Sequence, residues 1–213
     1  MLVVAEKVSK QFMGSKVLDS VNITINKGDR IAMMGPNGAG KTTLVRAMLG
    51  FYHINSGKIT VNGHDPVKER VKVLENISFI PQLPPPVKLS IEELLLYIGR
   101  SSGIPRERVL QEAGRMDLDI QKHISKPFFK LSGGMKQKLL IAIALSKESD
   151  LLIFDEPTAN LDPKGREKFY ELLTEIDESC STLFITHRLD EIKGLVNRQI
   201  YMDLGKVVED EKI

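Results

Sequence analysis

The stretch that decides the fold is residues 35–43, which read Gly35-Pro36-Asn37-Gly38-Ala39-Gly40-Lys41-Thr42-Thr43. It matches the pattern Gly-x-x-x-x-Gly-Lys-Ser/Thr, which forms a phosphate-binding loop (P-loop) when a buried strand precedes it and a helix follows it. Both neighbours are present, because the apolar run at residues 30–34 predicts a strand and residues 42–49, stopped by Gly50, predict a helix. We therefore predict a loop whose backbone N–H groups bind phosphate at the positive end of a helix dipole.

Two side chains of this loop have the chemistry that a nucleoside triphosphate requires. Lys41 would bridge the β- and γ-phosphates, and the Thr42 hydroxyl would ligate Mg²⁺. A chance match in a chain of this length has odds of about one in a hundred to two hundred. The alternative, a glycine-rich turn before an ordinary helix, therefore stays open until other motifs are considered.

The composition indicates one globular domain, with room for a subdomain. Of the 213 residues, 42% are hydrophobic and 27% are charged, which excludes a disordered chain. The 30 basic and 28 acidic residues are mixed along the sequence, so the net charge of +2 favours neither nucleic acid nor an anionic membrane surface. We expect no nucleic-acid partner.

Cysteine content and hydropathy indicate the compartment. The single cysteine, Cys180, excludes an internal disulfide and fits a reducing environment. Residues 1–6 reach a charge too early for a signal peptide, and no run approaches the roughly 18 apolar residues of a membrane span. We expect that the chain does not cross a bilayer by itself.

The N-terminal part predicts an antiparallel β layer. Residues 2–8 and 20–25 alternate apolar and polar side chains, as half-buried strands do. Phe12 lies in the predicted connection between them, where an aromatic ring either stacks on a nucleotide base or packs in the core. Beyond the P-loop helix, residues 56–64 predict a strand with an Asn-Gly turn, residues 66–74 a short helix and residues 77–80 a buried strand.

Residues 81–130 change in character and predict an inserted helical subdomain. The segment Pro81-Gln82-Leu83-Pro84-Pro85-Pro86 excludes a helix and is interpreted as a stiff hinge, although a proline-rich ligand for a recognition domain is the alternative. Ser90 and Glu93 form a capping-box pattern that opens a helix, and residues 105–114 predict a second helix.

Three further groups of residues are candidates for nucleotide chemistry. Ser132, Gly133 and Gly134 open an apolar helix and expose N–H groups to an anion; the alternative is a plain serine N-cap.

The apolar strand at residues 151–154 ends in Asp155 and Glu156, at the strand edge where parallel sheets bind ligands. Asp155 would hold Mg²⁺ and Glu156 would polarise a water molecule, unless the pair is a helix cap or solvated turn. The strand at residues 181–186 ends in His187, which would hydrogen-bond a γ-phosphate or else is a surface histidine.

The order of these motifs resembles the ATP-binding subunit of ABC transporters, over nearly the whole chain. The Leu-Ser-Gly-Gly sequence at residues 131–134 is the feature that separates this family from other P-loop ATPases. The resemblance implies an α/β fold, with a RecA-like P-loop NTPase core, a mainly parallel sheet, an N-terminal antiparallel β subdomain and an inserted α-helical subdomain. We expect the core to comprise residues 1–81 and 146–213, and the helical subdomain residues 82–145.

The resemblance also implies ATP and Mg²⁺ as cofactors and gives each motif a role. Glu156 is the general base, Gln82 touches the metal and water, His187 is the switch histidine, and residues 159–162 are the D-loop. The metal ligands are Thr42, Gln82 and Asp155, and Lys41 joins the catalytic set. The implied nucleotide-binding residues are Phe12, Gly35, Pro36, Asn37, Gly38, Ala39, Gly40, Lys41, Thr42, Thr43, Ser132, Gly133 and Gly134.

Two departures from the family pattern bear on the function. Met135 stands where the signature usually ends in glutamine, so one polar contact is lost while the serine and glycine contacts remain. The preceding stretch, Lys126-Pro127-Phe128-Phe129-Lys130, lacks the acidic, glycine-containing segment of exporters that are fused to their membrane domains. This favours a stand-alone ATPase subunit.

The resemblance predicts that two copies of the chain enclose two ATP molecules and drive a separate integral membrane subunit docked near Gln82. We expect a cytoplasmic protein, peripheral on the inner face of the cell membrane. The shortness of the chain favours an exporter. The alternative is a soluble ABC ATPase that serves cluster or cofactor assembly with no membrane partner.

Overall fold

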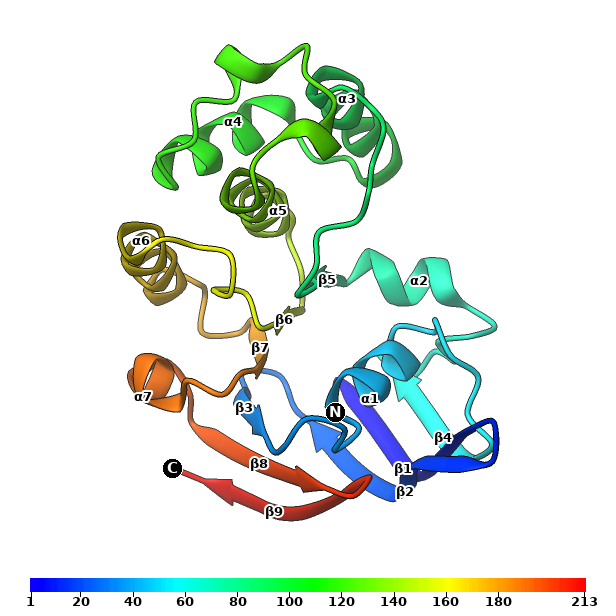
Figure 1. Ribbon diagram of the computed structural model, residues 1–213. Helices are drawn as coiled ribbons and strands as arrows, with labels where there is room; N and C mark the ends of the chain where they lie inside the picture. Colours follow the sequence, from blue (N-terminus) through cyan, green and yellow to red (C-terminus); the bar gives the residue numbers. More distant parts are fainter. The chain divides into compact units, whose positions relative to one another are not determined.

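The computed structural model describes residues 1–213 (Figure 1). Its contacts divide the chain into two units. The first comprises Met1–Ile77, Ser149–Asp155 and Asp177–Ile213, and the second comprises Ser78–Glu148 and Glu156–Ile176. None of the helices is both long enough and apolar enough to span a lipid bilayer.

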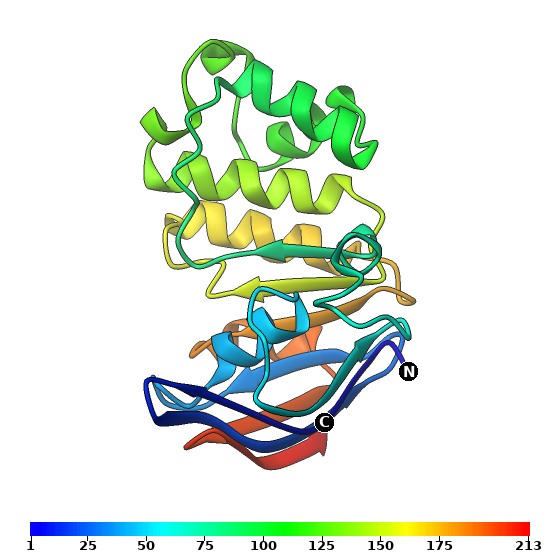
Figure 2. The same ribbon diagram turned by 90° about the vertical axis from the view of Figure 1, so that its right-hand side faces the viewer.

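The first unit contains the antiparallel layer that the N-terminal alternation predicts. Its strands are β1 (Val3–Phe12), β2 (Ser15–Ile25) and β4 (Ser56–Val61), in the order β2-β1-β4 (Figure 2). The first two strands extend further than predicted and meet in a tight hairpin. Phe12 is therefore the last residue of β1, paired with Ser15, and not part of a loose connection.

The second sheet of this unit is the predicted parallel sheet. Its strands are β3 (Arg30–Met34), β6 (Leu151–Asp155), β7 (Ser181–Ile185), β8 (Arg198–Asp203) and β9 (Lys206–Lys212), in the order β6-β7-β3-β8-β9. The first four are parallel, and β9 closes the edge as an antiparallel hairpin with β8. Asp155 and Met33 both pair in register with Ile185, so the carboxyl ends of these three strands are level.

Strands β6 and β7 are the most completely buried strands of this sheet. Every residue of β6 and of β7 is buried, and Phe154 stacks on its cross-strand neighbour Phe184 with ring centroids 4.7 Å apart. Cross-strand aromatic pairs of this kind add to sheet stability beyond the area that they bury.

The helices of the first unit are α1 (Lys41–Met48), α2 (Arg70–Glu75) and α7 (Leu189–Ile192). The short helix predicted at residues 66–74 forms only from Arg70. The Asp65 carboxylate accepts the N–H groups of Val67 and Lys68, which holds this segment as a turn and delays the helix. The chain passes from the first unit into the second within β5 (Ile77–Ile80).

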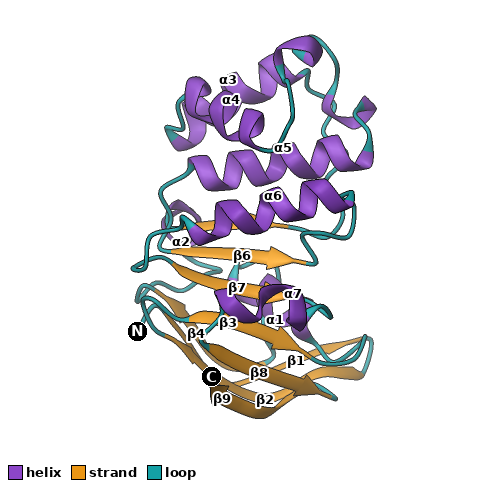
Figure 3. Ribbon diagram, turned by 90° about the vertical axis from the view of Figure 1, so that its left-hand side faces the viewer, coloured by secondary structure: helices purple, strands orange, loops and turns teal.

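The second unit is helical, as the proline segment and capping box predict (Figure 3). It holds α3 (Ile91–Ser102), α4 (Arg106–Arg115), α5 (Gly133–Ser146) and α6 (Pro163–Thr174). Ser90 and Glu93 form both reciprocal bonds of the capping box. The buried residues of its core are Ile91, Leu94, Leu95, Ile104, Val109, Ala113, Leu118, Ile120, Phe128, Leu131, Leu139 and Ala142.

Helix α6 lies beside α5 in this unit, which differs from the predicted grouping of residues 146–213 with the core (Figures 2 and 3). Ion pairs explain the association: the Asp117 carboxylate lies 3.1 Å from both Lys164 and Lys168 of α6. Arg115, at the end of α4, pairs with Glu175 just after α6. The second unit therefore contains residues 156–176 in addition to the helical subdomain predicted from the sequence.

Arg198 connects four segments of the first unit. Its guanidinium donates to both oxygens of Asp210 on β9, at 2.6 and 2.7 Å, and to Asp29 before β3, at 2.8 Å. It also donates to the Thr24 carbonyl of β2, at 2.7 Å. The side chain is only 12% exposed, so these bonds form largely out of water.

We predict that Arg198→Met lowers the free energy of unfolding by about 2 kcal/mol, because two carboxylates and a carbonyl lose their donor in a poorly solvated site. Urea unfolding measures the change. Lys72→Met is the matched control, since Lys72 is 59% exposed in its pair with Glu69 and its loss should leave the free energy of unfolding nearly unchanged. Equal effects of the two substitutions would contradict the prediction.

Candidate nucleotide-binding site

The P-loop of the first unit runs between β3 and α1, as the sequence predicts. Gly40 is the N-cap of α1 with φ of +98°, and Gly35 has φ of +134°. A Cβ at Gly35 would overlap the Met202 carbonyl, and one at Gly40 would lie 2.7 Å from the Val17 carbonyl. No side chain caps the first turn of α1, so its N–H groups are available to an anion.

Lys41 folds back over this loop. Its Nζ donates to the carbonyls of Gly35 and Pro36, at 2.6 and 2.9 Å, and the residue is only 7% exposed. These two bonds hold the Lys41 ammonium beside the loop, where it is placed to bind a polyphosphate.

Thr42 and Asp155 supply two convergent oxygen donors. The Thr42 hydroxyl donates to the Asp155 carboxylate at 3.0 Å, and Asp155 is 4% exposed at the end of β6. Burial raises the pKa of Asp155, while the hydrogen bond from Thr42 and the charges of Arg46 and Lys41 oppose the rise. A hydroxyl and a carboxylate are ligands that suit Mg²⁺, so this pair fits the predicted metal site.

The P-loop, Asp155 and His187 follow or end parallel strands whose carboxyl ends lie on one edge of the sheet. Strand β7 lies between β3 and β6, and the exposed His187 follows it after the buried Thr186. The Thr186 hydroxyl accepts the N–H of Arg188, which turns the chain at this edge. The parallel register thus brings the ends of β3, β7 and β6, three sequence-distant segments, to the same side.

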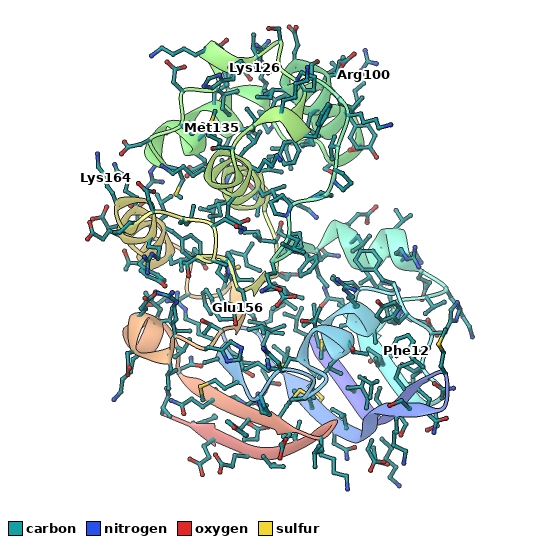
Figure 4. The ribbon with its side chains drawn as sticks, in the orientation of Figure 1. Phe12, Arg100, Lys126, Met135, Glu156 and Lys164 are labelled. Atoms are coloured by element: carbon teal, nitrogen blue, oxygen red, sulfur yellow. The ribbon has the colours of Figure 1, made fainter.

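An aromatic pair extends from α1 to the hairpin. Phe12 is 37% exposed and meets Tyr52 edge-on, with centroids 5.2 Å apart at 74° (Figure 4 labels Phe12). The Tyr52 hydroxyl accepts from Arg46 at 2.9 Å. Arg46 lies one turn beyond Thr42 on the same face of α1. Lys10 Nζ lies 4.7 Å from the Phe12 ring centroid. A planar ligand group that stacks on this face of the ring must therefore displace the lysine, which is only weakly held there.

The second unit carries the signature sequence. Ser132 is the N-cap of α5 and accepts the Met135 N–H at 3.2 Å; Gly133 and Gly134 form the first turn. Met135 packs against the buried core of the unit (Figure 4). An apolar contact therefore takes the place of the polar one that glutamine would make in the family pattern.

Gln82 and Glu156 also belong to the second unit. Gln82 is exposed, and its carbonyl accepts from the Asn160 side chain at 3.2 Å. Glu156 directly follows Asp155 in the chain and has φ of +47°, a left-handed conformation that is uncommon outside glycine. Such backbone strain concentrates at functional positions.

Within the first unit, therefore, the structure brings together Lys41, Thr42 and Asp155, and it places Phe12 beside Tyr52. The sequence analysis did not identify Arg46 or Tyr52, and it named Asn160 only as part of the D-loop at residues 159–162. Of Arg46 and Tyr52, only Arg46 had a sequence signal, its spacing of four from Thr42. Burial raises the pKa of the Cys180 thiol to about 11, which argues against a nucleophilic role.

Comparison with known proteins shows the family to which the chain belongs. The family model described as ABC transporter matches residues 18–159. The Nod factor export ATP-binding protein I of Sinorhizobium fredii is 37% identical, over 95% of this chain and 60% of that protein. The zinc import ATP-binding protein ZnuC of Pseudomonas fluorescens is 31% identical, over 95% of this chain and 74% of that protein. The chain spans between 37% and 74% of the length of the curated relatives that it matches.

Among solved structures, one described as the dimeric post-hydrolysis state of the ATP-binding cassette MJ0796 bound to ADP and Pi has a TM-score of 0.83. It is 25% identical and covers 99% of this chain and 98% of that chain. Fold, site geometry and sequence lead to one conclusion: the chain belongs to the ABC transporter family and is one of its ATPase domains.

Proposed function

We propose that the chain is the ATP-hydrolysing subunit of an ABC transporter and that two copies enclose two ATP molecules. The observation that carries this proposal is the combination of Lys41, Thr42 and Asp155 in the first unit with the open signature turn in the second. The signature turn serves the nucleotide of the second copy. The dimeric state in the description of the MJ0796 structure supports this arrangement.

The roles of the residues follow from their chemistry. The N–H groups of the P-loop and Lys41 bind the β- and γ-phosphates, and Ser132, Gly133 and Gly134 bind the γ-phosphate of the partner's nucleotide. Thr42, Asp155 and Gln82 would hold Mg²⁺. When bound, the ion neutralises the charge that develops on the phosphates.

Glu156 accepts a proton from the attacking water as the water oxygen bonds to the γ-phosphorus. The bond from that phosphorus to the bridging oxygen breaks, and ADP leaves with the electron pair. His187 orients the γ-phosphate through a hydrogen bond. Hydrolysis removes the group that joins the two copies, so the dimer opens.

We predict that Glu156→Gln lowers kcat by at least about a hundredfold, because the variant loses its proton acceptor. ATP should then hold the two copies together, and size-exclusion chromatography with ATP should show a dimer. Glu92→Gln is the matched control, since Glu92 is an exposed carboxylate in the first turn of α3. Unchanged steady-state hydrolysis in Glu156→Gln would contradict its role as the base.

The proposed subsite for the nucleotide base of ATP consists of Phe12, which Tyr52 contacts edge-on. We predict that Phe12→Ala and Tyr52→Ala each weaken ATP binding about five- to thirtyfold, since base stacking on an aromatic ring is worth roughly 1–2 kcal/mol. Binding of inorganic triphosphate, which has no base, should not change. Tyr52→Phe keeps the ring and should bind ATP like the wild type. Calorimetry with both ligands is the measurement, and equal losses for the two ligands would overturn the subsite.

We propose that the membrane partner docks near Gln82 and the proline segment that follows it. The chain would then lie in the cytoplasm, on the inner face of the membrane. The export direction is part of this proposal, and its support is that two relatives, 37% and 34% identical, are Nod factor export ATP-binding proteins. Cross-linking in native membranes followed by mass spectrometry should recover a multi-span protein. Recovery of a purely soluble complex would instead support the cluster-assembly alternative.

A further inference from the structure

The turn that joins β8 to β9 is bonded to both the P-loop and β2, all within the first unit. It comprises residues 203–206, and its central residues Leu204 and Gly205 are left-handed, with φ of +45° and +77°. The Gly205 N–H donates to the Ala39 carbonyl of the P-loop at 3.1 Å, and the Gly205 carbonyl accepts the Asp19 N–H of β2 at 2.9 Å. Gly205 therefore joins the P-loop to β2.

Close packing leaves no room for a side chain at this junction. A Cβ at Gly205 would lie 2.6 Å from the Val17 carbonyl oxygen of β2. A Cβ at Gly40 would lie 2.7 Å from the same oxygen and 3.6 Å from Gly205 Cα. Gly40, Gly205 and Ala39 are all buried. The turn and the P-loop are therefore packed against the same carbonyl group of β2.

The hydrogen bond from Gly205 sets the direction of one peptide group in the P-loop. The peptide between Ala39 and Gly40 is trans and planar, so its carbonyl and its N–H point in opposite directions. Because the carbonyl points at Gly205, the Gly40 N–H points away from the hairpin. Gly40 is the N-cap of α1, and N–H groups at such a helix terminus are the ones that bind anions.

We propose that Gly205 is a positioning residue for phosphate binding. The inference rests on the proposed function, in which the N–H groups of the P-loop bind the β- and γ-phosphates of ATP. Gly205 acts on the nucleotide only through the peptide between Ala39 and Gly40. It holds this peptide with the Gly40 N–H directed to a phosphate oxygen, so that the donor does not have to reorient when the nucleotide binds.

The test measures the binding of inorganic triphosphate and of ATP to the full chain by calorimetry. Gly205→Ala adds a methyl group that must move the turn away from the Val17 carbonyl, which weakens the bond to Ala39. Both ligands should bind this variant about five- to tenfold more weakly, the effect of losing one hydrogen bond. The two factors should be equal, because both ligands carry the phosphates.

Gly63→Ala is the matched control for backbone strain. Gly63 has φ of +80°, close to that of Gly205, but a Cβ there would meet no atom within 4 Å. A left-handed alanine should lower the free energy of unfolding in both variants, which urea unfolding measures. Gly63→Ala should nevertheless bind triphosphate like the wild type, so a general loss of stability is separated from an effect on the P-loop.

A measurement on the unaltered chain does not depend on whether Gly205→Ala folds. Amide hydrogen exchange, followed by NMR, reports how often the bond between Gly205 and Ala39 opens. Saturating inorganic triphosphate should slow exchange of the Gly205 amide by at least about tenfold, because a ligand on one side of the peptide stabilises the bond on the other. The Gly63 amide should keep its rate.

The outcomes distinguish this inference from the function on which it rests. A folded Gly205→Ala variant that binds triphosphate like the wild type, or that loses affinity for ATP alone, would overturn the positioning role. A Gly205 amide whose exchange rate does not respond to triphosphate would overturn it as well. A wild-type chain that binds neither triphosphate nor ATP would overturn the proposed function itself.

Discussion

The first unit depends on the junction between β3 and α1. The chain must leave β3, whose central residues are buried, turn within the six residues 35–40 and start a helix whose first turn has no side-chain cap. Glycine at positions 35 and 40 permits the turn, because a side chain there would meet the Met202 or Val17 carbonyl. The hydrogen bond between Thr42 and Asp155 then fixes the new helix to the edge of the sheet. The groups that we propose as phosphate and metal ligands lie at this junction.

The residues that we propose for hydrolysis fall in both units. The first unit contains Lys41, Thr42 and Asp155, and the second contains Gln82, Glu156 and the signature turn. Because Glu156 follows Asp155 directly, the chain itself couples a metal ligand to the proposed base through one peptide bond, at a residue with a strained φ of +47°.

Tertiary contacts also give meaning to residues that depart from the family pattern. Met135 packs on the helical core, which accounts for an apolar residue in place of glutamine. Asn160 uses one amide to reach two segments that are separated by about fifty residues of sequence. In the same unit, Asp117 and Arg115 hold α6 beside the other helices.

The sequence alone determined the P-loop, the antiparallel layer, the helical insertion, the parallel sheet and the family, because each depends on local patterns: glycine spacing, alternation of apolar residues, prolines and the Ser90 cap. Tertiary structure alone decided which distant side chains meet. Asp155 reaches Thr42 only because β6 and β3 share a register with β7. The spacing of Arg46 from Thr42 and the place of Asn160 in the D-loop can be read from the sequence. The edge contact of Phe12 with Tyr52, the bond from Arg46 to Tyr52 and the bond from Asn160 to Gln82 cannot, because each joins side chains that only the three-dimensional fold brings together.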